Sequence, residues 1–211
     1  MHIRGLSELP LVAILRGLPP DAAIDVGAVV VDAGFRALEV PLNSPQPLES
    51  IRRLQAKFGD RCLVGAGTVL SAAAVDEVAD AGGQLIVTPH TDVVVIGATK
   101  RRGMVSMPGT ATPSEAFAAL RAGADAIKVF PAEQISPKVL HAWRAVLPPE
   151  LGVFPVGGIT PDNMREYVAA GANGFGIGSA LYKPGRALDE IATLAQRFVQ
   201  EWAAIAPSHA R

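Results

Sequence analysis

The feature that most limits how this chain can fold is a short apolar segment that recurs eight times along it. Each segment is rich in β-branched or other apolar residues and is bounded by Gly, Pro, Asn or Ser, which is typical of a buried strand. The starts lie 20–27 residues apart, the length of one strand, one loop and one helix. The eight segments are Leu11–Arg16, Ala37–Leu42, Cys62–Thr68, Gln84–Pro89, Met104–Gly109, Ala126–Pro131, Val153–Ile159 and Gly174–Ser179.

The segments between these predicted strands carry the start and stop signals of helices. Ser or Thr stands at the N-cap or Pro at the first position, and Gly follows the last helical residue. The clearest predicted helices are Pro20–Ala33, Pro47–Phe58, Ser71–Ala81, Pro113–Ala122 and Pro161–Ala170. The sequence Asp32–Phe35 recurs loosely at later helix ends, which indicates a repeated βα unit.

Eight βα units with strands that are apolar throughout predict a parallel sheet buried on both faces. An α/β fold of the (β/α)8 TIM barrel type satisfies this pattern in a single domain over residues 1–211, with a core of about 8–205. A short N-terminal helix at residues 2–8 would close the bottom of the barrel. The alternative is an open doubly wound sheet, but Gly65–Gly67 is not followed by the third glycine of a dinucleotide-binding turn.

Charge and hydropathy exclude several classes of partner. The chain has 19 basic and 20 acidic residues, so its net charge is −1. This balance leaves no excess of positive charge that would attract nucleic acid or an anionic membrane. No apolar run approaches the roughly 18–20 residues that cross a bilayer, and the first ten residues lack the apolar core of a secretory signal. We therefore expect a cytoplasmic protein with no nucleic-acid or membrane partner.

The sequence offers no obvious metal site. Cys62 is the one cysteine, which excludes an intrachain disulfide. Of the four histidines, only His90 directly follows a predicted strand, and one histidine with one strand acid is not a usual ligand set. We expect neither a metal nor another cofactor.

Lys128 stands inside an otherwise apolar strand, Ala126–Pro131. Lysine is almost never fully buried without a partner or a function. The other lysines, including Lys183 after the eighth strand, fall on helices or in a loop, where we interpret them as solvated charges. Lys128 is either a snorkelling or salt-bridged lysine, or an amine that desolvation keeps neutral so that it can form a Schiff base with a carbonyl.

Two more charged residues belong to the strands, and catalytic groups of such barrels lie at the C-terminal strand ends. Glu39 is the one acid within a predicted strand. Its structural interpretation is an ion pair with an inward lysine or arginine, which does not exclude a role as a proton shuttle, since the same pairing would hold Glu39 beside a Schiff-base lysine. Arg16 ends the first strand and is either a rim arginine or a bidentate clamp for a carboxylate.

The seventh and eighth strands end in paired glycines. Gly157 and Gly158 follow one strand, and Gly176 and Gly178 precede Ser179 on the other. Glycine pairs let backbone N–H groups approach a ligand closely, and the loops after strands seven and eight are a recurrent phosphate site in these barrels. The alternative is that these glycines only make tight turns.

Together these segments resemble the KDPG/KHG aldolase family, the pyruvate-forming class I aldolases that cleave 2-keto-3-deoxy-6-phospho sugar acids. The resemblance covers about residues 9–205, and its ordered set is specific although each piece alone is weak. The matching segments are Val12–Gly17, Leu38–Pro45, Val64–Val69, Val87–Pro89, Pro108–Gly109, Ile127–Ala132 and Val156–Ile159.

The resemblance implies a role for each candidate residue. Lys128 would form the Schiff base and Glu39 would be the general acid and base. Arg16 and Thr68 would hold the carboxylate end of the substrate. The phosphate would be bound by Gly157, Gly158 and Ser179. A family member is also expected to be a homotrimer that takes a phosphorylated keto-deoxy sugar acid and releases pyruvate and glyceraldehyde 3-phosphate.

Position 43 bears on which epimer of the substrate is used. Relatives that act on the gluconate-derived substrate usually carry arginine where this chain has Asn43, and Leu42–Gln46 resembles the branch acting on 2-dehydro-3-deoxy-6-phosphogalactonate in galactonate breakdown. The two substrates differ at C4, next to the bond that breaks, so a residue near Glu39 can encode the choice. Phe130–Glu133 instead resembles the gluconate branch, and His90 departs from the expected residue. The gluconate-derived epimer, or both, therefore remains an alternative.

Two other functions share parts of the pattern. A phosphosugar isomerase on a similar barrel would use the same glycine loops but would not need a strand lysine for covalent chemistry. A phosphosugar-binding barrel without catalysis would leave Lys128, Glu39 and Arg16 without a purpose.

Overall fold

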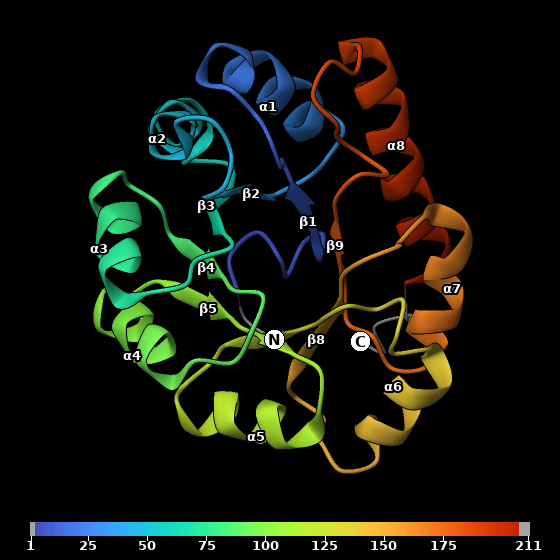
Figure 1. The fold of residues 1–211 in the computed structure, drawn as a ribbon. Coiled ribbons are helices and arrows are strands. Elements are labelled where there is room, and N and C mark those ends of the chain that lie inside the picture. The colour runs from blue at the N-terminus through green and yellow to red at the C-terminus, as the bar shows by residue number, and fades with distance from the viewer. Residues whose placement is uncertain (1–2, 207–211) are drawn as a thin grey trace.

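The computed structural model describes residues 3–206 as parallel strands surrounded by helices (Figure 1). The strands are β1 (Leu11–Ile14), β2 (Ala37–Pro41), β3 (Leu63–Gly67), β4 (Leu85–Val87), β5 (Val105–Met107), β6 (Gly109–Thr110), β7 (Ala126–Val129), β8 (Gly152–Pro155) and β9 (Phe175–Ile177). The helices are η1 (Pro20–Ala22), α1 (Ala23–Asp32), α2 (Pro47–Phe58), α3 (Ala72–Asp80), α4 (Val93–Arg101), α5 (Pro113–Arg121), α6 (Pro137–Arg144), α7 (Pro161–Ala169) and α8 (Leu188–Ile205).

The strands form two parallel sheets, in the orders β5-β4-β3-β2-β1-β9 and β6-β7-β8. Pro108, which has no N–H to donate to a ladder, stands between β5 and β6. On the other side, a single parallel bridge joins Val156 to Gly176. The predicted α/β class with parallel strands is therefore confirmed. The predicted closed barrel is not, because the strands within residues 3–206 form two separate sheets.

All eight predicted strand segments contain a strand, and the five predicted helices form with ends that match or differ by one residue, except that residues 20–22 form the 3-10 helix η1 ahead of α1. The caps explain where several helices begin. The Ser71 hydroxyl accepts a hydrogen bond from the Ala74 N–H at 3.2 Å, and the Thr112 hydroxyl accepts one from the Glu115 N–H at 3.2 Å. Each bond satisfies an N–H that has no partner inside the helix.

The N-terminal helix expected at residues 2–8 is not confirmed. Residues 4–8 form turns, in which the Ile3 carbonyl accepts hydrogen bonds from the N–H groups of Leu6 and Ser7, and residue 2 lies outside the described range. Gly5 has a φ of +79°, a left-handed conformation that interrupts a right-handed helix. Ile3 and Leu6 are nevertheless buried, in one cluster with Val12 and Leu63 from the starts of β1 and β3.

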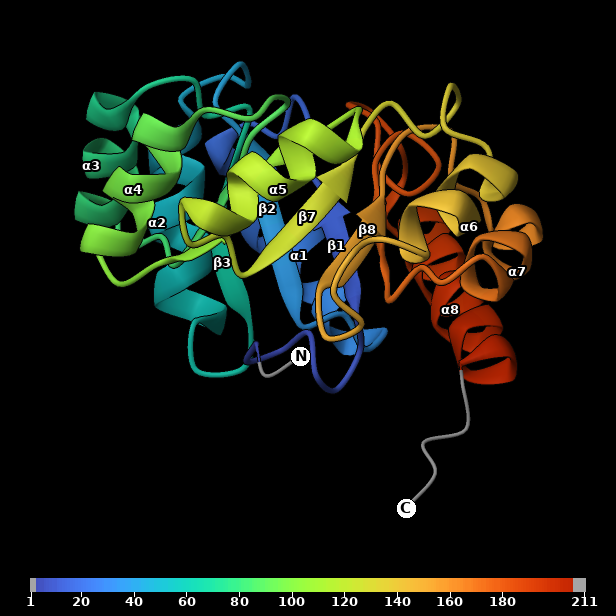
Figure 2. The same cartoon turned by 90° about the horizontal axis from the view of Figure 1, so that it is seen from below.

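The helices cover the outer faces of the strands, with α2–α4 gathered toward one end of the molecule and α6–α8 toward the other (Figure 2). The long α8 packs against β9 through Trp202, whose ring centroid is 6.2 Å from that of Phe175. None of the helices in the described part of the chain combines the length and the apolar character that crossing a membrane requires.

Candidate active site

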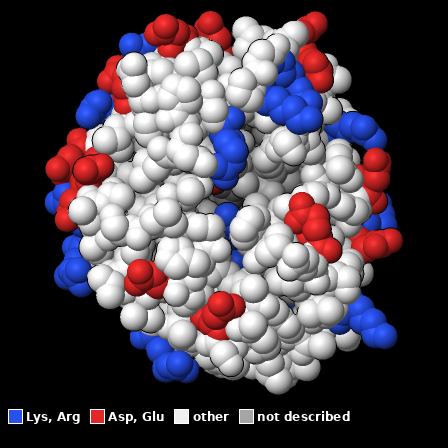
Figure 3. Space-filling view, viewed as in Figure 1, with Lys and Arg blue, Asp and Glu red and all other residues white. Residues whose placement is uncertain are grey.

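A cavity of about 740 Å³ opens among the C-terminal ends of β1, β2 and β7 and the loops after β8 and β9. Figure 3 shows a hollow near the middle of this face, with basic side chains at its edge and inside it. Because all the strands run in parallel, the residues that follow them converge at this one end of the fold. Of the site residues expected from the sequence, Arg16, Glu39, Lys128, Gly157, Gly158 and Ser179 line the cavity, whereas Asn43 and Thr68 are not among the residues that line it.

Lys128 lies in the middle of the second sheet, and its side chain is only 6% exposed. Its ammonium lies 4.4 Å from the centroid of the Phe130 ring. Burial lowers the pKa of Lys128; the charge of Glu39 opposes this shift and that of Arg16 adds to it. A lower pKa raises the fraction of neutral amine, which is the nucleophilic form.

Glu39 on β2 is 2% exposed, and its Oε2 has no hydrogen-bond partner. Burial raises the pKa of Glu39 to about 7, although the positive charges of Lys128 and Arg16 act to lower it. A carboxyl group with this pKa can both give and take a proton near neutral pH. The alternative role of an ion-pair partner is not observed, because no ion pair joins Glu39 to a cation within residues 3–206.

Gly67, at the end of β3, makes room for the Glu39 carboxylate. A Cβ on Gly67 would lie 2.0 Å from Oε2 of Glu39, far inside van der Waals contact. Any side chain at position 67 would therefore displace the carboxylate. The spacing of the predicted strands did not show this requirement, because it depends on a contact between two neighbouring strands.

Arg16 is held by two neutral groups from distant parts of the chain. Its Nη1 donates a hydrogen bond to Oδ1 of Asn43 at 2.5 Å, and its Nη2 donates one to the hydroxyl of Thr68 at 3.4 Å. Thr68 has a φ of +55°, which is rare for a β-branched residue. Neutral partners fix the guanidinium without cancelling its charge, so Arg16 remains available to an anionic ligand.

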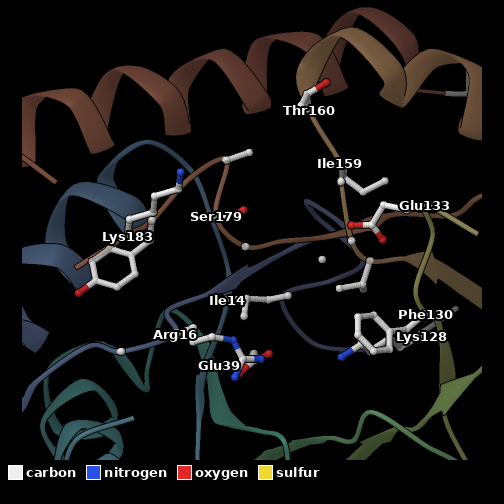
Figure 4. A pocket seen from close by; sticks show the side chains of 18 of the residues that line it. Ile14, Arg16, Glu39, Lys128, Phe130, Glu133, Ile159, Thr160, Ser179 and Lys183 are labelled. Carbon is white, nitrogen blue, oxygen red and sulfur yellow. The ribbon is translucent and has the colours of Figure 1, made fainter. Parts of the chain in front are cut away.

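The charged groups face one another across the cavity (Figure 4). Arg16 and Glu39 lie together on one wall, and Lys128 reaches toward them from the wall formed with Phe130. The three side chains come from β7, from β2 and from the loop after β1, so only the fold brings them together.

The glycine loop after β8 leads directly into α7. Gly157 and Gly158 have φ values of +108° and +64°, which glycine adopts without strain. The Asn163 side chain accepts a hydrogen bond from the Thr160 N–H at 3.0 Å and donates one to the Gly158 carbonyl at 2.8 Å. These bonds fix the loop at the helix start, where N–H groups favour an anion.

Some cavity residues were not predicted from the sequence. Phe130, Glu133 and Arg186 line the cavity, and so does Lys183, which we interpreted as a solvated charge. Lys183 is indeed exposed, but it lies in the loop after β9, which forms part of the cavity wall. His90 does not line the cavity; its Nε2 lies 3.9 Å from a carboxylate oxygen of Asp92. In the described range, no three His, Cys, Asp or Glu side chains gather as a metal site would require.

The fold and the site together define a class of enzyme. A desolvated lysine, a carboxyl group with a pKa near 7 and an uncompensated arginine share one cavity at the C-terminal end of parallel strands. These are the parts of a lysine-dependent enzyme that acts on a carbonyl compound carrying a carboxylate.

The chain belongs to the KDPG and KHG aldolase family, whose sequence profile matches residues 3–194, and it is an aldolase. It is 47% identical to the 2-dehydro-3-deoxy-6-phosphogalactonate aldolase of Escherichia coli (strain K12), over 93% of this chain and 96% of that protein. It is 31% identical to the KHG/KDPG aldolase of the same strain, over 92% and 93% of the two chains. The native KDPGal structure superposes with a TM-score of 0.94 at 45% identity, covering 96% of this chain and 98% of the other.

Proposed function

We propose that this protein is a class I aldolase that cleaves 2-dehydro-3-deoxy-6-phosphogalactonate into pyruvate and D-glyceraldehyde 3-phosphate in galactonate catabolism. The observation that carries the proposal is the buried Lys128 amine, whose pKa is lowered, in one cavity with the buried Glu39 carboxyl group. Two relatives at 47% identity carry the name of this activity, one of them as probable.

The first step joins the substrate to the enzyme. The neutral amine of Lys128 adds to the C2 ketone, and loss of water leaves an iminium ion. Arg16 and Thr68 hold the substrate carboxylate next to the ketone, which keeps C2 within reach of the amine. The positive iminium nitrogen then serves as the electron sink for the C3–C4 bond.

Cleavage and release follow with Glu39 as the proton carrier. Glu39 takes the proton of the C4 hydroxyl, directly or through a water, as the C3–C4 electrons move to the iminium and form an enamine. Glyceraldehyde 3-phosphate leaves as the aldehyde. Glu39 then returns a proton to C3, and water hydrolyses the new iminium to pyruvate and free Lys128. A pKa near 7 suits both transfers, since efficiency is best when the pKa lies near the working pH.

The phosphate end of the substrate would lie in the corner made by Gly157, Gly158 and Ser179. The start of α7 follows this corner, and the positive end of its helix dipole favours an anion there. This arrangement sets the distance from the phosphate to Lys128 and so selects the length of the sugar acid.

Asn43 supports the galactonate-derived substrate. Its amide oxygen accepts the hydrogen bond from Arg16, so the residue that distinguishes the two branches touches the residue assigned to the substrate carboxylate. An arginine at this position would add a second positive charge beside Arg16. The gluconate-derived epimer is the second candidate, because a relative at 31% identity carries the name KHG/KDPG aldolase.

We also infer that the two sheets act as one (β/α)8 barrel in a single domain of residues 1–211, with a core of about 8–205, and that the protein is a cytoplasmic homotrimer. The Val156–Gly176 bridge and the single-residue gap at Pro108 support the barrel. A designed cage, built by fusing symmetric oligomeric domains, matches 94% of this chain with a TM-score of 0.92, covering 73% of the cage chain. That match supports an oligomer.

A pyruvate-release assay on the two epimeric substrates tests the proposed function. We expect release from the galactonate-derived substrate to exceed release from its epimer by at least tenfold in kcat/KM, about 1.4 kcal/mol of transition-state discrimination. Faster release from the epimer would assign the gluconate branch. No release from either, with conversion of an aldose to a ketose phosphate instead, would identify an isomerase.

A further inference from the structure

The side chain of Glu133 lies against the glycine corner assigned to the phosphate. A Cβ on Gly157 would be 2.2 Å from Oε2 of Glu133 and 3.1 Å from its Oε1, and a Cβ on Gly158 would be 2.9 Å from its Cγ. The carboxylate therefore occupies the space that the two glycines leave open. The anion site assigned to the substrate already has an anionic side chain packed over it.

Nothing else in the described structure holds this carboxylate. Glu133 is exposed, and within residues 3–206 it has neither a hydrogen bond nor an ion pair. Figure 4 shows its carboxylate directed into the cavity, across from Ser179 and Lys183. An exposed glutamate without a partner can change rotamer at little cost, so a ligand can displace it.

The opposite wall carries positive charge. Lys183 has no ion-pair partner among the described residues, whereas Arg186 pairs with Glu190 at 3.0 Å and donates to three backbone carbonyls. An incoming phosphate therefore meets an available cation on one side and an uncompensated carboxylate on the other. The attraction and the repulsion oppose each other at the same ligand group.

We propose that Glu133 is a specificity-determining residue that competes with the ligand phosphate for the Gly157–Gly158 corner. Its carboxylate weakens binding of phosphorylated ligands and so favours release of the phosphorylated aldehyde. The identity of the ligand as a phosphorylated aldehyde rests on the proposed function; the competition between a carboxylate and a phosphate does not. A charge and a dianion several ångströms apart in a water-like medium repel enough to change a dissociation constant roughly three- to tenfold.

Binding of inorganic phosphate tests the competition without any turnover. Glu133→Gln keeps the shape of the side chain and removes its charge, and Glu77→Gln on α3, outside the cavity, removes one charge elsewhere. The Kd is read from the rise of Tm with phosphate concentration, because a ligand that binds only the folded state stabilises it. We expect a three- to tenfold lower Kd for Glu133→Gln and no change for Glu77→Gln. An unchanged or higher Kd for Glu133→Gln overturns the proposal, as does an equal decrease in both variants.

A second measurement separates this inference from the proposed function. In the condensation direction with pyruvate, the KM for glyceraldehyde 3-phosphate should fall in Glu133→Gln relative to the KM for unphosphorylated glyceraldehyde. A ratio of the two KM values equal to that of wild type would contradict the inference while leaving the aldolase assignment intact. Failure of the wild type to condense pyruvate with either aldehyde would instead reject the aldolase assignment, and the phosphate Kd would still decide the role of Glu133.

Discussion

Glu39→Gln should change how the stability of the protein depends on pH. Burial raises the pKa of Glu39 to about 7 from its ordinary value of 4.5, so between these values the folded state binds more protons than the unfolded state. Stability therefore falls as pH rises through this range, because ionising the buried carboxyl group is unfavourable. Glutamine cannot ionise, so the variant does not have this pH-dependent loss of stability.

The size of the effect follows from the two pKa values. The folded-state and unfolded-state pKa values of Glu39 differ by about 2.5, which corresponds to about 3 kcal/mol of unfolding free energy. The full amount is lost at a pH where Glu39 is ionised in both states. Between pH 5 and pH 8, the variant should gain about 2–3 kcal/mol of unfolding free energy relative to wild type. Because Lys128 lowers the pKa of Glu39, the same comparison in a Lys128→Met background should shift the change to higher pH.

Urea unfolding of wild type and Glu39→Gln at several pH values between 5 and 8 measures this difference. Equal m-values in the two proteins would show that the same surface is exposed on unfolding, so that the free energies can be compared. A wild-type-to-variant difference that stays constant within about 0.5 kcal/mol over this range would refute a desolvated Glu39 with a raised pKa.

Three more predictions concern activity. In Glu39→Gln, the pyruvate adduct should still be trapped by borohydride, while exchange of the methyl protons into deuterated solvent falls roughly 10²–10⁴-fold; normal exchange in a folded variant would identify another base. Gly67→Ala, whose Cβ would meet the Glu39 carboxylate, should lose about 1–3 kcal/mol of stability and at least about tenfold in kcat, and wild-type values for both would disprove the packing argument. EDTA should leave the rate unchanged, and loss of activity that a divalent ion restores would move the protein to a metal-dependent class.

The parallel α/β architecture could be predicted because its signals are local. Apolar runs set the strands, and caps such as Ser71 and Thr112 set where helices begin. The break at Pro108 was not predicted, although the proline is visible in the sequence. Whether its missing N–H interrupts a ladder depends on which strand lies beside it, and that is a tertiary feature. The N-terminal turns at residues 4–8 were missed because one glycine with positive φ decides between a turn and a helix.

The location of Lys128 and Glu39 at one cavity could be predicted, because a charge within an apolar strand needs a reason. Lys128 and Glu39 stand out for this reason alone. The support of Arg16 could not be predicted, since Asn43 and Thr68 lie 27 and 52 positions away in the sequence. The contact of Glu133 with the glycine loop is likewise tertiary, and no local pattern marks it.

Trapping of pyruvate on Lys128 tests the central claim most directly. Protein incubated with pyruvate and borohydride is digested, and the modified peptide is identified by mass. We predict one reduced pyruvate adduct per chain, on Lys128, with no adduct and loss of at least about 90% of turnover in a folded Lys128→Met variant. An adduct on another lysine, an active wild type that traps no pyruvate, or a Lys128→Met variant that retains more than about a tenth of the activity would contradict the account.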